Sequence, residues 1–184
     1  MKILALQGSP RKNGNTATLM NSFLKGMLDL GGHEIEVVHL NDKNINPCKG
    51  CESCKELKDR YCVNNDHMTA LYPKFIDADL IVFASPVYWW SISSQLKLFV
   101  DRLYALIWDD KKACFASKRI VIILTFGDGE PCPGADLVVK MFEEISRYLG
   151  MKIVGIMRYS SGERHVSECK QKLDEAYEMG LRMK

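Results

Sequence analysis

The chain has 184 residues, of which 47% are hydrophobic and 26% are charged, and its formal net charge is +2. These values are typical of a globular protein with one sizeable core, and they give no case for nucleic acid or an anionic membrane as the main partner. No apolar run reaches the ~18 residues that cross a bilayer, and the short apolar start does not match a signal peptide. We therefore expect a cytoplasmic protein in which residues 1–184 form a single domain.

The hydrophobic pattern predicts five strands that alternate with five helices. Strands are expected at residues 3–6, 35–40, 80–84, 120–126 and 152–158, and helices at 15–30, 67–76, 95–106, 135–149 and 166–181. An intervening helix favours parallel pairing of successive strands, so the fold class is α/β with helices on both faces of a parallel sheet. Such sheets bind ligands at the carboxyl ends of their strands, and the loops at this edge are the expected functional part of the chain.

The loop after the first strand, residues 7–16, has the composition of a phosphate site. A glycine-containing turn into a helix offers free backbone N–H groups and the positive end of the helix dipole. Ser9, Asn15 and Thr16 add side-chain donors, and Arg11 adds a fixed positive charge. The loop matches neither GxGxxG nor GxxxxGK[ST], which disfavours a dinucleotide fingerprint and a P-loop. An ordinary polar turn is the alternative, because Gly and Asn are common in turns.

The loop at residues 85–94 begins Ser-Pro-Val-Tyr-Trp-Trp and supplies flat apolar surface one strand away. Its backbone N–H groups can meet the polar edge of a heterocycle while an aromatic side chain covers the ring face. A phosphate beside a planar ring describes a mononucleotide, and flavin mononucleotide (FMN) suits both loops. The alternative places Trp89 and Trp90 in the core or in a subunit interface, and in a dimer the two uses are compatible.

Four of the seven cysteines fall in the long polar loop at residues 41–66. Their spacing is Cys-x-x-Cys-x-x-Cys followed by seven residues and a fourth Cys, and they are Cys48, Cys51, Cys54 and Cys62. The first three have the spacing that begins a ferredoxin-type [4Fe–4S] sequence, with Pro47 and Gly50 for the turns. Zinc and the absence of any metal are the alternatives. The other three cysteines, Cys114, Cys132 and Cys169, are expected to be packed or incidental thiols.

Three motifs resemble the flavodoxin-like NAD(P)H-dependent FMN reductase family: Gly8-Ser9-Pro10-Arg11-x-x-Gly14-Asn15-Thr16, Ser85-Pro86-Val87-Tyr88 and Leu96-Lys97-x-x-x-Asp101-Arg102. The cysteine spacing resembles the iron–sulfur flavoprotein branch, with a final gap at the long end of its range. The resemblance is specific to about residue 102 and looser beyond. It implies a flavodoxin-like three-layer sandwich with a five-stranded parallel sheet in the order 2-1-3-4-5. It also implies tightly held FMN in a homodimer or dimer of dimers, with the flavin near the interface.

The resemblance further implies individual binding roles. The residues that would hold the FMN phosphate are Ser9, Arg11, Asn15 and Thr16, with Asn13 close by. Those that would lie along the isoalloxazine ring are Pro86, Val87, Tyr88 and Trp89. A third loop matches in position only, and its candidates are Thr125 and Gly127, with Asp128 and Gly129 beside them. The candidate metal ligands are the four loop cysteines.

Other charged residues receive no chemical role from the sequence. Lys97 is expected to be a charge in the first turns of its helix, and Asp101 and Arg102 a surface or interface ion pair. Asp66 is expected to cap the helix that follows the cysteine loop. The four histidines are dispersed, so a nucleophilic hydrolase is not supported and no catalytic residue is assigned.

The favoured function is an FMN-dependent oxidoreductase that takes hydride from NADH or NADPH. Its electrons would pass to a quinone, a flavin, a ferric chelate, a nitroaromatic compound or a redox protein, with the redox chemistry supplied by the cofactor. One alternative is an electron carrier of the iron–sulfur flavoprotein kind, reduced by ferredoxin and holding a [4Fe–4S] cluster. Another is a flavin-free module that binds zinc through its cysteines.

Overall fold

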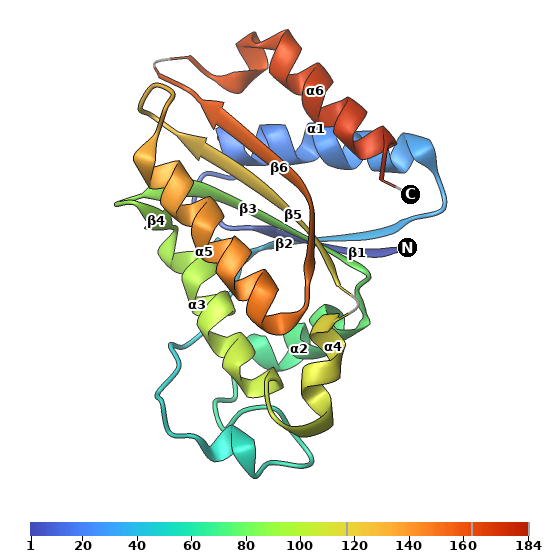
Figure 1. Ribbon diagram of the computed structural model, residues 1–184, viewed down its shortest axis with the longest axis vertical. Coiled ribbons are helices and arrows are strands. Elements are labelled where there is room, and N and C mark those ends of the chain that lie inside the picture. The colour runs from blue at the N-terminus through green and yellow to red at the C-terminus, as the bar shows by residue number, and fades with distance from the viewer. Residues whose placement is uncertain (117, 163, 184) are drawn as a thin grey trace.

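The computed structural model describes residues 1–116, 118–162 and 164–183. Its centre is a parallel sheet between two layers of helices (Figure 1). The parallel strands are β1 (Lys2–Gln7), β2 (Glu34–His39), β3 (Leu80–Tyr88), β5 (Arg119–Phe126) and β6 (Lys152–Ser160). Their order is β2-β1-β3-β5-β6, which is the predicted order 2-1-3-4-5 once the short strand β4 (Ser91–Ile92) is set aside. The predicted fold class is confirmed.

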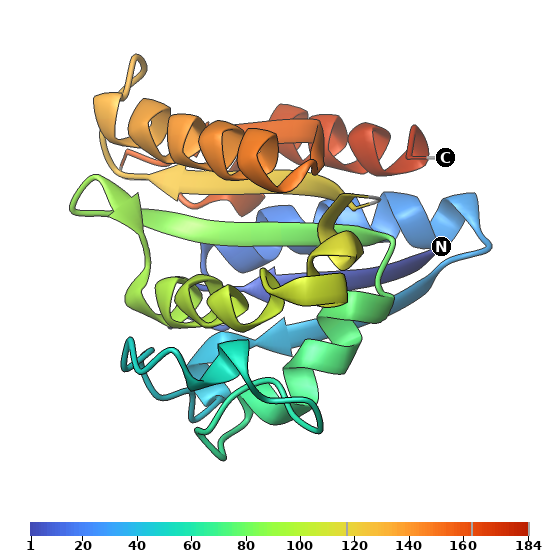
Figure 2. The same ribbon diagram turned by 60° about the horizontal axis from the view of Figure 1, so that its bottom comes forward.

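Helices cover both faces of the sheet (Figures 1 and 2). One face carries α1 (Asn15–Leu30) and α6 (Lys170–Leu181). The other face carries α2 (Met68–Asp77), α3 (Ser94–Arg102), α4 (Ala113–Ala116) and α5 (Pro133–Leu149). In the part of the chain that the structure describes, no helix has both the length and the apolar character needed to cross a membrane.

The unbroken apolar runs of the strands follow from burial on both faces. Leu4 and Leu6 of β1 belong to the core under α2, α3 and α5, whereas Ile3 and Ala5 belong to the core under α1 and α6. Successive side chains of a strand point to opposite faces, so a strand covered on both sides carries no polar alternation. Removal of this apolar surface from water, at roughly 25 cal/mol per Å², is the main force that holds the layers together.

The third strand is longer than predicted. The expected end was Ala84, but β3 continues to Tyr88, and Pro86 pairs in register with Thr125 of β5. The last residues of β3 then pair antiparallel with β4, so that Val87 faces Ile92. A proline near the end of a strand removes only one ladder donor and does not stop the strand. What was predicted as a loop is therefore largely a tight hairpin.

The helices α1 and α6 approach each other at two glycines. A Cβ atom on Gly26 would lie 2.0 Å from the carbonyl oxygen of Tyr177, and one on Gly180 would lie 2.1 Å from that of Phe23. No side chain fits at such distances, so glycine at these two positions is what permits the close crossing. The crossing fixes the position of α1, whose first turn adjoins the loop predicted to bind phosphate.

Candidate functional site

The loop after β1 is anchored to its neighbours at Gly8. The N–H of Gly8 donates to the carbonyl of Ala84 at 2.8 Å, and the hydroxyl of Ser93 donates to the carbonyl of Gly8 at 2.6 Å. A Cβ atom on Gly8 would lie 2.9 Å from Cβ of Leu96, so the loop backbone lies directly against α3. These contacts couple the predicted phosphate loop to β3 and to the first turn of α3.

The start of α1 is open to an anion. Its N-cap is Gly14, with φ −78° and ψ 176°, and no side chain accepts a hydrogen bond from the first turn. The hydroxyl of Ser9 instead accepts the N–H of Arg11 at 3.1 Å. A long helix whose first N–H groups lack a side-chain cap directs them and its dipole at the loop in front of it. The geometry thus fits a phosphate, which would take the place of the missing cap.

The predicted phosphate residues differ in what their side chains do. Ser9 and Thr16 are buried and Arg11 is exposed. The hydroxyl of Thr16 is hydrogen-bonded to that of Thr125 at 2.6 Å, which brings the first loop to the end of β5. Two candidates that the sequence placed 109 residues apart therefore meet at one point.

The segment that follows β6 also contacts the predicted phosphate loop, and no sequence motif indicated this contact. The side-chain oxygen of Asn15 accepts the N–H of Val166 at 2.7 Å, which leaves only its NH₂ group for a ligand. Nε2 of His165 donates to the carbonyl of Asn13 at 3.2 Å, and Nδ1 of the same ring accepts the N–H of Ser167. His165 is therefore a missed residue of this site, and its separation of 152 residues from Asn13 explains why.

The aromatic hairpin between β3 and β4 has an unusual backbone. Its two turn residues, Trp89 and Trp90, have φ of 47° and 58°. Bulky side chains rarely adopt this left-handed region, at a cost of roughly 1–3 kcal/mol each. Trp89 is 90% exposed, Trp90 is 58% exposed and the two rings lie 5.9 Å apart. This strained turn places both indole rings on the surface of the molecule, where they can cover a ligand ring or contact another subunit.

The remaining ring candidates line the base of the same hairpin. Pro86 is buried, Val87 is half-buried and Tyr88 is 43% exposed. The hydroxyl of Ser85 accepts the N–H of Ser93 at 2.9 Å, which closes the hairpin onto the first turn of α3. Gly127, in the third loop, is exposed beyond the end of β5. The three predicted cofactor loops thus lie at the carboxyl ends of adjacent strands.

The four loop cysteines line one pocket. It lies against the end of α3 and the residues after it, where Arg102, Tyr104 and Ala105 form its wall. Cys54 is buried, Cys62 is half-buried, and Cys48 and Cys51 are exposed. Gly50 and Glu52 have φ of 63° and 59°, and these left-handed residues turn the chain between successive cysteines.

The thiols of this pocket differ in acidity. A hydrogen bond from Ser53 lowers the pKa of the Cys51 thiol, whereas burial raises the pKa of Cys54. Among the described residues, no three His, Cys, Asp or Glu side chains are gathered at ligating distance. Four thiols that line one pocket are nevertheless, by their chemistry, the donor set that an iron–sulfur cluster or zinc requires.

The cysteine pocket does not lie beside the three predicted cofactor loops. The cysteine loop leaves from the carboxyl edge of the sheet, as predicted, but the chain then follows α3 to its far end. Ser93, before α3, bonds to Gly8, and Arg102 is the last residue of this nine-residue helix. A helix of this length spans about 13 Å. The helix α3 therefore connects the two predicted redox sites.

The expectation of a surface or interface ion pair at Arg102 was wrong. Its side chain is 1% exposed and that of Asp66 is fully buried, with Nη1 of Arg102 2.6 Å from Oδ2 of Asp66. Burial is the largest single influence on the Arg102 guanidinium and disfavours its charge, but the hydrogen bond to Asp66 together with the nearby Tyr72 and Cys62 outweighs burial and raises the pKa of Arg102. Burial is also the largest influence on Asp66, but the hydrogen bonds and charge of Arg102 together with the backbone N–H groups of Asn46 and Met68 lower the pKa of Asp66. Only Lys97 and Asp101 form an exposed pair on this helix.

Asp66 was expected to cap α2; the N-cap is His67, and Asp66, one residue earlier, still contacts the first turn. Its Oδ1 accepts the N–H of Met68 at 3.0 Å, at the first residue of α2. Its other carboxylate oxygen accepts the N–H of Asn46 at 2.9 Å. One carboxylate therefore joins the start of α2, the cysteine loop and the end of α3.

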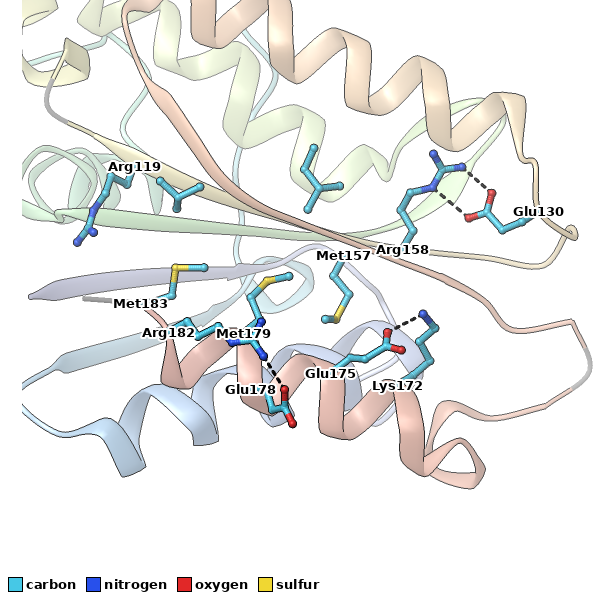
Figure 3. A pocket seen from close by; sticks show the side chains of 12 residues that line it. Arg119, Glu130, Met157, Arg158, Lys172, Glu175, Glu178, Met179, Arg182 and Met183 are labelled. Atoms are coloured by element: carbon cyan, nitrogen blue, oxygen red, sulfur yellow. Dashed lines mark hydrogen bonds and ion pairs between the residues drawn. The ribbon is translucent and has the colours of Figure 1, made fainter.

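A large groove lies elsewhere, between β6 and α6 (Figure 3). Its volume is about 880 Å³, and the thioethers of Met157, Met179 and Met183 line it. The ion pairs along it include Arg158 with Glu130 and Arg182 with Glu178 (Figure 3). It contains none of the predicted cofactor residues, so its size does not make it the candidate site.

Comparison with known proteins identifies the family of this chain. A family model for NADPH-dependent FMN reductases matches residues 1–151. An iron–sulfur flavoprotein of Archaeoglobus fulgidus is 40% identical over 103 residues, which are 56% of this chain and 46% of that protein. One from Methanosarcina thermophila is 30% identical over 155 residues, 84% of this chain and 78% of that protein. The chain thus spans about half the length of the first of these curated relatives.

Solved structures agree in fold. An FMN-dependent NADH-azoreductase from Bacillus anthracis, in complex with FMN, has a TM-score of 0.78 at 17% identity, over 100% of this chain and 99% of that one. The Trp repressor binding protein from Bacillus subtilis has a TM-score of 0.72 at 24% identity, over 99% of both chains. At such identities the likeness concerns the fold alone.

Proposed function

The chain belongs to the NADPH-dependent FMN reductase family, and from this premise we propose that residues 1–184 act as one FMN-binding domain of an oxidoreductase. Bound FMN would supply hydride and electron chemistry that no side chain offers. The protein would take hydride from NADH or NADPH and pass electrons to a quinone, a flavin, a nitroaromatic compound or another acceptor. The name of the Methanosarcina thermophila relative, a flavoprotein, supports the flavin part of this proposal.

The observation that carries the proposal is the uncapped start of α1 facing an anchored loop. The phosphate would lie against the N–H groups there, with Ser9, Arg11, Asn13, Asn15 and Thr16 around it. The neutral hydroxyl pair of Thr16 and Thr125 is buried and holds the first and third loops at a fixed spacing. A site positioned by such contacts binds with little loss of conformational freedom.

The ring of FMN would lie across the end of β3. Pro86, Val87, Tyr88 and Trp89 offer apolar surface there, and Gly127 offers backbone without a side chain in the way. A cluster of exposed aromatic side chains on a protein surface is typical of an interface. We therefore propose that a second copy of the chain covers part of this hairpin in a homodimer or a dimer of dimers.

A second candidate function is carried by the cysteine pocket. We propose that Cys48, Cys51, Cys54 and Cys62 hold a [4Fe–4S] cluster, since all four line one pocket and the curated relatives described above are named iron–sulfur flavoproteins. The protein would then act as an electron carrier that ferredoxin reduces. Zinc on the same thiols is the weaker candidate, because the loops that fit FMN would have no use in a zinc module.

An anaerobic visible spectrum with iron, sulfide and zinc analysis tests the cofactors together. The expected result is the absorption of oxidised flavin, with FMN released on heating, and iron and sulfide in equal amounts if the cluster is present. Stopped-flow mixing with NADH, NADPH or reduced ferredoxin then separates the two functions. Reduction of FMN by ferredoxin and by neither nicotinamide would refute the reductase, and a colourless zinc protein would refute both.

A further inference from the structure

Arg102 lines the cysteine pocket, and Nε of its guanidinium makes no hydrogen bond in the structure. Nη1 donates to the carbonyl of Asn46 at 2.8 Å and to Asp66 at 2.6 Å, and Nη2 reaches the second oxygen of Asp66 at 3.3 Å. Nε is buried and has no hydrogen-bond partner in the structure. A buried N–H of a charged group without a partner is expensive, so its presence calls for an acceptor.

The surroundings of Arg102 hold this donor in place. Asp66 binds the guanidinium fork through both carboxylate oxygens, which fixes the plane of the group. The hydroxyl of Tyr72 donates to the backbone carbonyl of Arg102 at 3.0 Å, which fixes the end of α3. The guanidinium therefore cannot reorient without breaking a buried ion pair.

Four thiols line the same pocket, together with the polar side chains of Lys49, Glu52, Asn64 and Tyr104. A thiolate sulfur bound to a metal keeps lone pairs that accept hydrogen bonds, and such bonds set the reduction potential of iron–sulfur clusters. A reduced cluster carries one more negative charge than an oxidised one. A fixed positive charge beside it therefore stabilises the reduced state and raises the potential.

We propose that Arg102 is a positioning residue of the cysteine-bound centre, in which its Nε–H donates to a ligand sulfur and its charge raises the reduction potential. Asp66 is a second positioning residue, because its carboxylate fixes the guanidinium of Arg102 and offsets part of the positive charge. This inference rests on the cluster of the proposed function and goes beyond it by assigning the residues that tune the cluster.

Three variants separate tuning from simple support of the loop. Arg102→Lys keeps the positive charge and the partner of Asp66 but lacks the Nε–H. Asp66→Asn keeps the shape and the acceptor for Met68 but removes the negative charge that offsets the guanidinium. Lys97→Gln is the matched control, since it removes a charge from the exposed side of the same helix.

Each protein is reconstituted anaerobically with iron and sulfide, and the cluster potential is measured by a dye-mediated redox titration read by electron paramagnetic resonance. We expect Arg102→Lys to shift the one-electron equilibrium about tenfold toward the oxidised state, which is ~59 mV. We expect Asp66→Asn to shift it in the opposite direction and Lys97→Gln to leave it unchanged. The potential of bound FMN should stay constant, because its loops lie at the other end of α3.

The outcomes distinguish this inference from the cluster proposal itself. If the parent protein takes up no iron, the cluster is absent and the inference falls with it. If the parent loads but Arg102→Lys and Asp66→Asn keep its potential, the cluster stands and the tuning role is wrong. If both variants lose iron while the remaining cluster keeps the parent potential, Arg102 and Asp66 only support the loop.

Discussion

Replacing Ser93 with alanine tests whether α3 positions the phosphate loop. Ser93 is fully buried, and its hydroxyl donates to the carbonyl of Gly8 at 2.6 Å and accepts the N–H of Leu96 at 3.3 Å. Loss of such a cap costs typically ~1 kcal/mol, and a buried carbonyl left without its donor costs about 1–3 kcal/mol. We expect Ser93→Ala to lower the free energy of unfolding by about 2–4 kcal/mol.

The same substitution should weaken cofactor binding. The loop at Gly8 loses one of the two hydrogen bonds that hold it against its neighbours. Part of the binding free energy of FMN is then needed to order the loop. A cost of ~1.4 kcal/mol corresponds to a tenfold weaker Kd. The assays are urea unfolding of FMN-free protein and titration of the same protein with FMN, followed by flavin fluorescence.

Ser94→Ala is the matched control. Ser94 is exposed on the next position of the helix, and its hydroxyl contacts only the side chain of Gln95 at 3.2 Å. An exposed change of this kind should stay within about 0.5 kcal/mol of the parent. If Ser93→Ala and Ser94→Ala have equal stability and equal FMN affinity, the reasoning that couples α3 to the loop is wrong.

Two further substitutions test the packing of α1 and the buried ion pair. Gly26→Ala should lower the free energy of unfolding, measured in urea, by about 2 kcal/mol. Overpacking against the α6 backbone costs up to ~3 kcal/mol, and the better helix propensity of alanine offsets ~1 kcal/mol of this. Asn21→Ala, on the exposed face of α1, is the control and should leave the free energy of unfolding unchanged. The lowered pKa of Asp66 means that its ion pair stabilises the fold above the unfolded-state pKa of ~3.9, and that this stability is lost as the pH falls through the lower folded pKa. Unfolding curves at several pH values should therefore show the parent more stable than Asp66→Asn at neutral pH, with a difference that shrinks as the pH falls below the unfolded-state pKa of ~3.9. A difference that stays constant with pH would contradict this assignment.

The hairpin at Trp89 and Trp90 shows one limit of sequence reasoning. Turns with two positive φ values usually carry Gly, Asn or Asp, so two tryptophans gave no signal for a tight hairpin. The Ser-Pro dipeptide was interpreted as the end of the strand for a similar reason. Pairing with β4 and β5 overrides both local preferences, and this pairing exists only once the sheet is assembled.

Arg102 shows a second limit. Arg102 directly follows Asp101 in the sequence, and the two were therefore expected to form a surface or interface ion pair. The true partner, Asp66, is 36 residues away in the sequence. It reaches Arg102 because the cysteine loop folds back along α3, and no local pattern records the path of a long loop.

Hydrophobic periodicity, a local property of the chain, determined the layered α/β fold, and the resemblance carried by the loop motifs implied the family and with it the strand order. The sequence also marked Ser9, Thr16 and the four cysteines as the residues to examine. Only the tertiary structure decided that Thr16 meets Thr125, that His165 and Val166 close on Asn13 and Asn15, and that a buried Arg102–Asp66 pair lies beside the cysteines. These contacts join segments far apart in the chain, and their geometry depends on how the helices and loops pack on the sheet.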